Sequence, residues 1–134
     1  MHGRAVSGEI QDKNTNLRAL GVERGYIVIQ PNANPAVPNS AWSEDDDDTV
    51  VDFVRRAIEN YAADEARVHI TGFSQGGFMT WRMACNHGDL FASVAPASAC
   101  GSDLDGNASC SFAGGDAPSR TVPMYLIVAA SGDS

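Results

Sequence analysis

The sequence predicts an α/β fold, a mostly parallel sheet flanked by helices on both faces. Apolar strand-like runs alternate with helix-like segments along the chain, and these runs are apolar nearly throughout. Strands that are covered on both faces have such sequences, and alternating strands and helices build parallel sheets. The 134 residues and 43% hydrophobic content suffice for one core, so we expect a single domain over residues 1–134.

Four segments have the composition of strands, and the last is the most strongly predicted of them. They are residues 26–30, 67–71, 92–96 and 123–129. Two segments rich in Pro, Gly, Ser, Asn or Asp, at 31–45 and 98–121, are expected to be loops. Loops at the carboxyl ends of parallel strands carry the ligand sites of such sheets.

Three segments have helical patterns: residues 13–24, 46–61 and 75–87. In the second of them, apolar residues recur at steps of three and four and therefore share one face. The acidic run Glu44–Asp48 lies at its N-terminus, where carboxylates cap backbone N–H groups and complement the helix dipole. A metal site would need a second cluster of ligands, and the sequence suggests none, so we expect no metal and no cofactor.

The charge balance excludes some partners. The net charge of −8 repels phosphate backbones, so nucleic acid is not an expected partner. No apolar stretch approaches the roughly 20 residues that span a bilayer, and the first residues do not form a signal peptide. The sequence does not indicate an oligomeric state.

The three cysteines have different contexts. Cys85 lies in an apolar helical pattern and is expected to be a small buried hydrophobic residue. Cys100 and Cys110 lie in the predicted loop at 98–121. The sequence leaves two alternatives for this pair, a disulfide bond or two free thiols. Because no C-x-x-C pair occurs, a structural zinc site is not predicted.

The most specific motif is Gly72-Phe73-Ser74-Gln75-Gly76, which has the pattern G-x-S-x-G. It follows a predicted strand and opens a predicted helix, which is the context of a nucleophile elbow. A sharp turn there holds the serine hydroxyl above the sheet in a strained backbone conformation, and glycines let strand and helix approach closely. We therefore expect Ser74 to be a nucleophile, with the backbone N–H of Gln75 directed at developing negative charge. The alternative is a glycine-rich turn with an incidental serine.

Two further groups complete the expected machinery. In enzymes with this elbow, a second oxyanion donor comes from an upstream loop, often within an H-G motif. His2-Gly3 has this sequence, so the backbone N–H of Arg4 is the expected donor. The acid of the triad should follow a later strand, as Asp133 does; its rivals, in the preceding loop, are Asp103, Asp105 and Asp116.

The expected triad lacks its histidine. It should follow Asp133, where only Ser134 remains. The histidines present are given structural roles: His2 as a brace of the oxyanion loop, His69 as a residue packed against a helix, and His87 at a helix C-terminus. None of them is expected to be the base.

Several segments together resemble secreted bacterial polyhydroxybutyrate-depolymerase-like and feruloyl-esterase-like hydrolases of the α/β-hydrolase superfamily. The matching segments are residues 1–3, 25–31, 67–85 and 89–96, and the tail 125–133 is similar to the strand and turn that bear the family's acid. The usual H-G-T-x-D there is replaced by Ala129-Ala130-Ser131-Gly132-Asp133. Acyl-protein thioesterases share Gly-Phe-Ser-Gln-Gly-Gly, but the continuation Met-Thr-Trp favours the depolymerase-like group.

The resemblance implies an α/β-hydrolase catalytic domain that is incomplete at both ends, since the family has earlier strands and a later histidine. It implies an esterase acting on hydroxyalkanoate or hydroxycinnamoyl esters, secreted, and inactive or nearly so as this chain alone. Candidate substrate contacts are Trp42, Phe78 and Trp81. A serine peptidase of the prolyl-peptidase type and an inert truncated copy are the alternatives.

The family's strand order yields one more expectation. The strand that leads into the His-Gly loop lies between the strands at 26–30 and 67–71, and only Met1 of it is present. We therefore expect a gap or an unusual pairing between those strands, low stability, and edge pairing with other copies.

Overall fold

The computed structural model describes residues 1–34, 41–99 and 120–127. Its helices are α1 (Gly8–Thr15), α2 (Leu17–Glu23), α3 (Asp47–Tyr61) and α4 (Gln75–Asn86). Short 3-10 turns precede or follow them: η1 (Glu44–Asp46), η2 (Glu65–Arg67) and η3 (Gly88–Leu90). The strands are β1 (His69–Phe73) and β2 (Ser93–Ala97).

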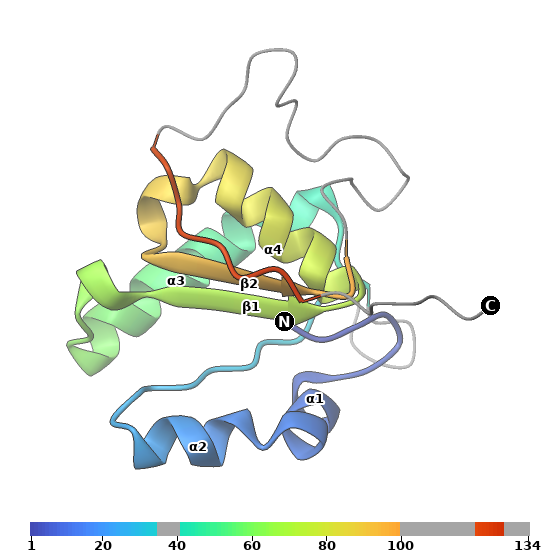
Figure 1. The fold of residues 1–134 in the computed structure, drawn as a ribbon, viewed down its shortest axis with the longest axis horizontal. Coiled ribbons are helices and arrows are strands. Elements are labelled where there is room, and N and C mark those ends of the chain that lie inside the picture. The colour runs from blue at the N-terminus through green and yellow to red at the C-terminus, as the bar shows by residue number, and fades with distance from the viewer. Residues whose placement is uncertain (35–40, 100–119, 128–134) are drawn as a thin grey trace.

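The two strands pair in parallel, with His69 opposite Ser93 at one end and Phe73 opposite Ala97 at the other. Residues 120–127 run along the far edge of β2 (Figure 1), joined by parallel bridges from Val94 to Met124 and from Ala97 to Ile127. Strands are therefore found where three of the four were predicted, with the last seen only as bridges and only as far as residue 127.

The predicted strand at 26–30 is wrong: this segment is not assigned to any strand or bridge. The edge of β1 that faces away from β2 is occupied by Met1, whose amino nitrogen donates to the Thr71 carbonyl and whose carbonyl accepts from Phe73 N at 3.2 Å. A strand forms only against a partner strand, and the described residues provide none beside 26–30. Of the two expected arrangements, a gap or an unusual pairing between 26–30 and 67–71, the described residues have the first, since no ladder or bridge joins these segments.

The predicted helix at 13–24 is replaced by α1 and α2, which meet at Asn16. Asn16 adopts the left-handed conformation, with φ 52°, and its N–H donates to the Asp12 carbonyl. Asparagine is one of the few residues that visits this region readily. A left-handed residue ends a helix, so the periodic pattern is interrupted there.

The helix α3 begins as predicted from its acidic run. Asp46 is buried and accepts from Ser43 N at 2.8 Å, which forms a capping box ahead of the helix. Arg82 on α4 pairs with Asp47 at 2.8 Å and with Glu44 at 3.2 Å. The acidic run therefore caps α3 and joins its start to α4.

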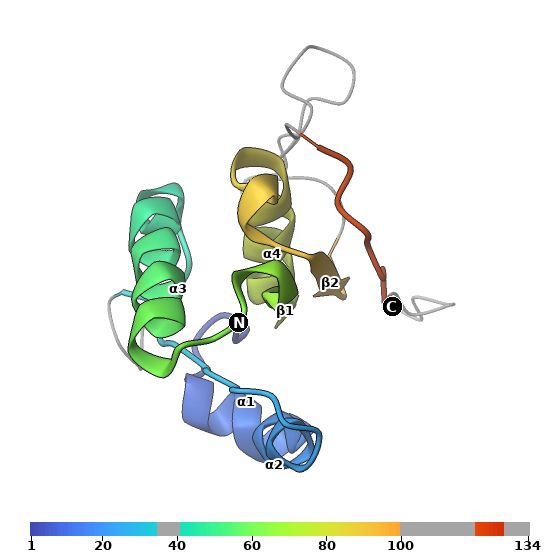
Figure 2. The same ribbon diagram turned by 90° about the vertical axis from the view of Figure 1, so that its left-hand side faces the viewer.

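The helices lie on both sides of the strands (Figures 1 and 2), with α3 and α4 on one side and α1 and α2 on the other. The helix α4 contacts both strands, and its Met79 and Met83 are almost fully buried. They and Ala84 of the same helix belong to one core with residues of α3, β1, β2 and the flanking loops: Ala33, Trp42, Val50, Val51, Ile70, Phe91 and Val94.

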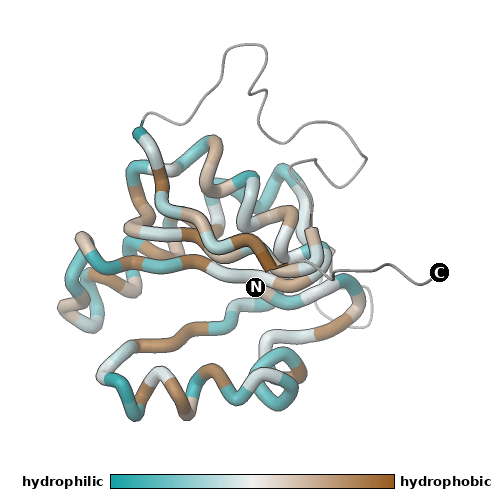
Figure 3. The backbone as a smooth tube through the Cα atoms, viewed as in Figure 1, coloured by the Kyte–Doolittle hydropathy of each residue, from teal (hydrophilic) through white to brown (hydrophobic). Residues whose placement is uncertain are grey.

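The side with α1 and α2 is poorly covered. Neither helix buries an apolar side chain, and Val22 is 67% exposed. Tyr26, Ile27 and Ile29 of the neighbouring extended segment are exposed as well, and Figure 3 shows these apolar stretches along the lower part of the chain. Within the described ranges, no helix has the length and apolarity that crossing a membrane requires.

Cys85 differs from its predicted role. It is buried on α4, as expected, but it is disulfide-bonded. Cys100 and Cys110, for which a disulfide and free thiols were both open, lie outside the described residues.

Candidate active site

Ser74 lies at the junction between the end of β1 and the start of α4. Its backbone has φ 54° and ψ −119°, outside the ordinary helical and strand regions, as the sequence predicts. A non-glycine residue held there costs about 1–3 kcal/mol and persists only when its surroundings enforce it. Ser74 N donates to the Ala97 carbonyl at 2.9 Å, and the Ser74 carbonyl accepts from Gly77 N at 2.8 Å. Both sides of the residue are therefore fixed.

Two glycines allow the turn to be this sharp. A Cβ on Gly72 would lie 2.1 Å from the Gly76 carbonyl oxygen. A Cβ on Gly76 would lie 2.4 Å from the Met1 carbonyl oxygen and 2.6 Å from that of His2. The strand, the helix and the N-terminal segment are thus in direct backbone contact, and only glycine fits at these two positions.

The N-terminal segment is held by His2, whose side chain is fully buried. Its Nε2 accepts from Ala33 N at 2.9 Å, so its proton is on Nδ1, which donates to the Gly3 carbonyl at 2.7 Å. Burial lowers the pKa of His2 below its ordinary value, which favours the neutral ring that this bonding requires. The structure therefore agrees with a bracing role for His2.

Trp42 joins this segment to the start of α4. Its indole Nε1–H donates to the His2 carbonyl at 2.9 Å, and its backbone N–H donates to Gln75 Oε1 at 3.1 Å. The indole also packs on the His2 ring, with centroids 5.0 Å apart. Since Trp42 is only 3% exposed, it has almost no surface for a substrate, which does not fit its expected role as a substrate contact.

The first turn of α4 presents backbone donors beside Ser74. The first N–H groups of a helix have no partner within the helix, and those of Gln75 and Gly76 are at this position in α4. The helix dipole adds partial positive charge at the same end. This end of α4 is therefore suited to an oxyanion next to the Ser74 hydroxyl.

The other predicted site residues are only partly placed by the structure. Arg4 is exposed in the turn that follows Gly3, and a Cβ built on Gly3 would lie 3.6 Å from Ser74 Cβ, so this loop is next to the serine. Phe78 and Trp81 are half-buried on α4. The predicted acid and its rivals lie outside the described residues: Asp133, Asp103, Asp105 and Asp116.

Neither remaining histidine can reach Ser74. His69 is at the opposite end of β1, about 16 Å away at 3.3 Å per residue, and His87 follows the far end of α4, about 20 Å away at 1.5 Å per residue. His69 is exposed, bonded through Nδ1 to Ser93 Oγ at 2.8 Å. The sequence-based expectation that His69 packs against a helix is therefore wrong: the side chain projects from β1 beside the Tyr26 ring.

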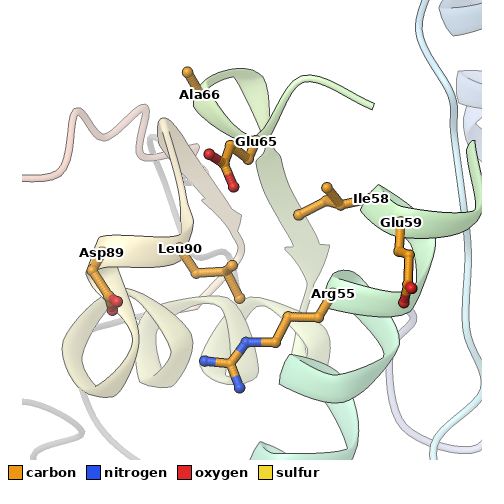
Figure 4. A pocket seen from close by; sticks show the side chains of 7 residues that line it. All are labelled: Arg55, Ile58, Glu59, Glu65, Ala66, Asp89 and Leu90. Atoms are coloured by element: carbon orange, nitrogen blue, oxygen red, sulfur yellow. The ribbon is translucent and has the colours of Figure 1, made fainter. Parts of the chain in front are cut away.

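Figure 4 shows a pocket that lies apart from this site. Its lining residues come from α3, η2 and η3: Arg55, Ile58, Glu59, Glu65, Ala66, Asp89 and Leu90. Since η2 precedes β1 and η3 follows α4, the pocket is at the opposite ends of these elements from Ser74. It is not the place where a substrate of Ser74 would bind.

Sequence reasoning missed the network that surrounds the elbow. Ala33 and Trp42 bond to His2 across 31 and 40 positions of sequence, and Trp42 bonds to Gln75 across 33. No short motif carries a contact of this range. The only available signal is a large aromatic residue in an otherwise small and polar predicted loop.

A parallel sheet with helices on both sides, and a glycine-flanked serine at a strand-to-helix turn, are the features of the α/β-hydrolase class. A model of the prolyl oligopeptidase family matches residues 36–106. The chain therefore belongs to the prolyl oligopeptidase family of α/β-hydrolases.

Curated relatives include proteins named as esterases and as a depolymerase. The chain is 32% identical over 103 residues to "Putative esterase NocK" of Nocardia uniformis subsp. tsuyamanensis, covering 71% of this chain and 30% of the relative. It is 33% identical over 89 residues to poly(3-hydroxyalkanoate) depolymerase C of Paucimonas lemoignei, covering 58% and 22%. For feruloyl esterase B of Thermothelomyces thermophilus the identity is 30% over 88 residues, covering 58% and 30%. The chain thus spans less than a third of the length of these relatives.

Proposed function

We propose that this chain carries the nucleophile of a serine carboxylic ester hydrolase. The observation that carries the proposal is the strained Ser74 between β1 and α4, in contact with the His-Gly segment. The relatives named as esterases and depolymerases support the same reaction class. Polyhydroxyalkanoate-type and hydroxycinnamoyl esters are the proposed substrates.

In the proposed reaction, Ser74 Oγ attacks the ester carbonyl carbon while a base takes its proton. The backbone N–H groups of Gln75 and Arg4 stabilise the oxyanion of the tetrahedral intermediate. The bond to the alcohol breaks, the alcohol leaves with the proton, and water then hydrolyses the acyl-serine to a free acid. Asp133 would orient the base.

The base is the one member of this scheme that the chain does not provide. A general base must come within roughly 3 Å of the hydroxyl. Both ring nitrogens of His2 are engaged in bonds, and His69 and His87 are too distant. The proposal therefore requires a histidine other than these three, and the chain alone is expected to be almost inactive.

Phe78 and Trp81 remain the proposed contacts for an apolar acyl group. Both lie on α4, the helix that begins at the nucleophile. Phe78 is one helical turn from Ser74, whose carbonyl accepts from Phe78 N at 3.1 Å, so it is the nearer candidate.

A serine peptidase is the second candidate, and the match to the prolyl oligopeptidase family favours it. Both reactions use the same serine and the same oxyanion donors. They differ in the bond that is cleaved, which a pair of substrates can distinguish.

The test compares nitrophenyl esters with peptide nitroanilides, using the full-length product of the gene that encodes this chain. We expect ester hydrolysis that Ser74→Ala abolishes and that Ser93→Ala, at the far end of the sheet, retains. Turnover of anilides alone would favour the peptidase, and ester turnover that survives Ser74→Ala would refute both.

We also propose that the protein works in an oxidising compartment outside the cytosol. The disulfide at Cys85 supports this proposal, because disulfides persist in secreted and periplasmic proteins and are rare where thiols are kept reduced. Fractionation of the source cells tests it: we expect the protein outside the cytosol, and an exclusively cytosolic protein would refute the proposal.

A further inference from the structure

Trp42 is placed between the two backbone segments that flank Ser74. On one side its indole N–H donates to the His2 carbonyl, and on the other its backbone N–H donates to the Gln75 side chain. The His2 carbonyl belongs to the peptide that leads into Gly3 and the Arg4 turn. Gln75 is the first residue of α4. One residue thus bonds to both of the segments that carry the proposed oxyanion donors.

Trp42 itself is rigidly held. Its ring is buried in the core and packs on the His2 imidazole. The chain directly after it is fixed by the capping box between Ser43 and Asp46. Because both its indole ring and its backbone are held in place, Trp42 can keep the two neighbouring segments at a constant separation, which a mobile surface residue cannot do.

We propose that Trp42 is a positioning residue for the oxyanion hole. It sets the separation between the His2–Gly3 backbone and the first turn of α4, and thereby aligns the donors on the two sides of Ser74. This inference rests on the proposed esterase function. It assigns Trp42 a role in transition-state stabilisation that acts entirely through other groups.

The physical reason is the steep dependence of a hydrogen bond on geometry. Removal of one oxyanion donor lowers kcat roughly 100- to 1000-fold, so a donor that is displaced but present should cost less, about 10-fold. The charge develops only in the transition state. The loss should therefore fall on kcat, with KM little changed.

The test uses full-length protein and a pair of substrates that differ only at the carbonyl, an ester and its thionoester. Sulfur accepts hydrogen bonds weakly, so the preference of the enzyme for the C=O substrate measures how well the hole is aligned. Trp42→Phe keeps an aromatic ring in the core and removes the indole donor. We expect it to lower the ester-to-thionoester ratio of kcat/KM about 10-fold.

Two further variants separate positioning from folding. Gln75→Met keeps the side-chain length, removes the acceptor for Trp42 N, and should lower the same ratio. Because either change breaks the same bridge, the double variant should lose less than the product of the single losses. Val51→Ala truncates a core residue of α3 that has no part in the bridge; it can reduce the folded fraction but should leave the ratio unchanged.

The outcomes are distinguishable. Ser74-dependent ester hydrolysis with an unchanged ratio in Trp42→Phe and Gln75→Met would overturn the role of Trp42 and leave the esterase proposal intact. An equal fall of the ratio in Val51→Ala would also overturn it. Ester hydrolysis that is absent, or that survives Ser74→Ala, would refute the proposed function and this inference with it.

Discussion

Gly76 offers a sharp test of the contact between the elbow and the N-terminal segment. In Gly76→Ala, the new methyl group would lie 2.4 Å from the Met1 carbonyl oxygen and 2.6 Å from that of His2. Both are backbone atoms, and the His2 carbonyl is also held by Trp42 at 2.9 Å. The segment can make room only by moving as a unit, so its bonds to Trp42 and to β1 would be strained.

The expected cost follows from this overlap. Forcing extra volume into a well-packed site costs typically about 1–3 kcal/mol, while alanine in place of glycine favours a helix by about 0.8–1 kcal/mol. The net loss in the free energy of unfolding should therefore be up to about 2 kcal/mol. The displaced segment should also lower kcat for esters.

Urea unfolding and ester turnover of the full-length protein measure the two effects. Gly21→Ala is the comparison variant, because its methyl group would lie 2.1 Å from Val28 Cγ2, a side-chain atom, and not against backbone. We expect it to cost less stability than Gly76→Ala, because a side chain gives way more readily than backbone, and to leave ester turnover unchanged. A Gly76→Ala protein as stable and as active as the comparison variant would refute the reasoning.

Four further outcomes are expected. The 134-residue chain alone should hydrolyse nitrophenyl esters feebly or not at all, since no histidine reaches Ser74; robust Ser74-dependent turnover would contradict this. Because burial lowers the pKa of His2, the neutral ring should contribute its full stabilisation above the ordinary pKa of about 6.5, and this contribution should be lost as the pH falls toward the pKa of the folded state. Urea titrations should show a weaker pH dependence of the free energy of unfolding over this window in His2→Gln. Cys85→Ser should lower the free energy of unfolding by about 2–5 kcal/mol, and equal stability with and without reductant would contradict a structural disulfide. The His69 end of the β1 edge, which Met1 does not cover, and the 48% exposed Phe73 should promote self-association of the chain; a cooperative, monomeric species in sedimentation and melting experiments would contradict it.

The sequence predicts the sharp turn at Ser74 and the helix α3 well because local rules determine both. Steric demands act within the few residues around Ser74, so the pattern of glycines suffices to place the turn. The helix α3 is specified by its apolar spacing and by the acidic residues that cap it. In each case the determining contacts lie within a few positions of sequence.

The features that the sequence predicts wrongly depend on contacts with distant parts of the chain. Residues 26–30 have the composition of a strand, but pairing requires a neighbouring strand that the described residues do not supply. Trp42 is a large aromatic residue in a predicted loop, which suggests a substrate contact, yet its hydrogen bonds are to His2 and Gln75, far away in sequence. Only the three-dimensional arrangement shows that it is buried.

Covalent labelling of the serine tests the central claim most directly. Full-length protein is treated with a fluorophosphonate, in which the activated serine oxygen forms a bond to phosphorus and fluoride leaves, and the adduct is mapped by peptide mass spectrometry. We predict a single stoichiometric adduct on Ser74 and none in Ser74→Ala. No adduct on Ser74, or an adduct on another serine, would contradict the claim that this strained turn carries the nucleophile.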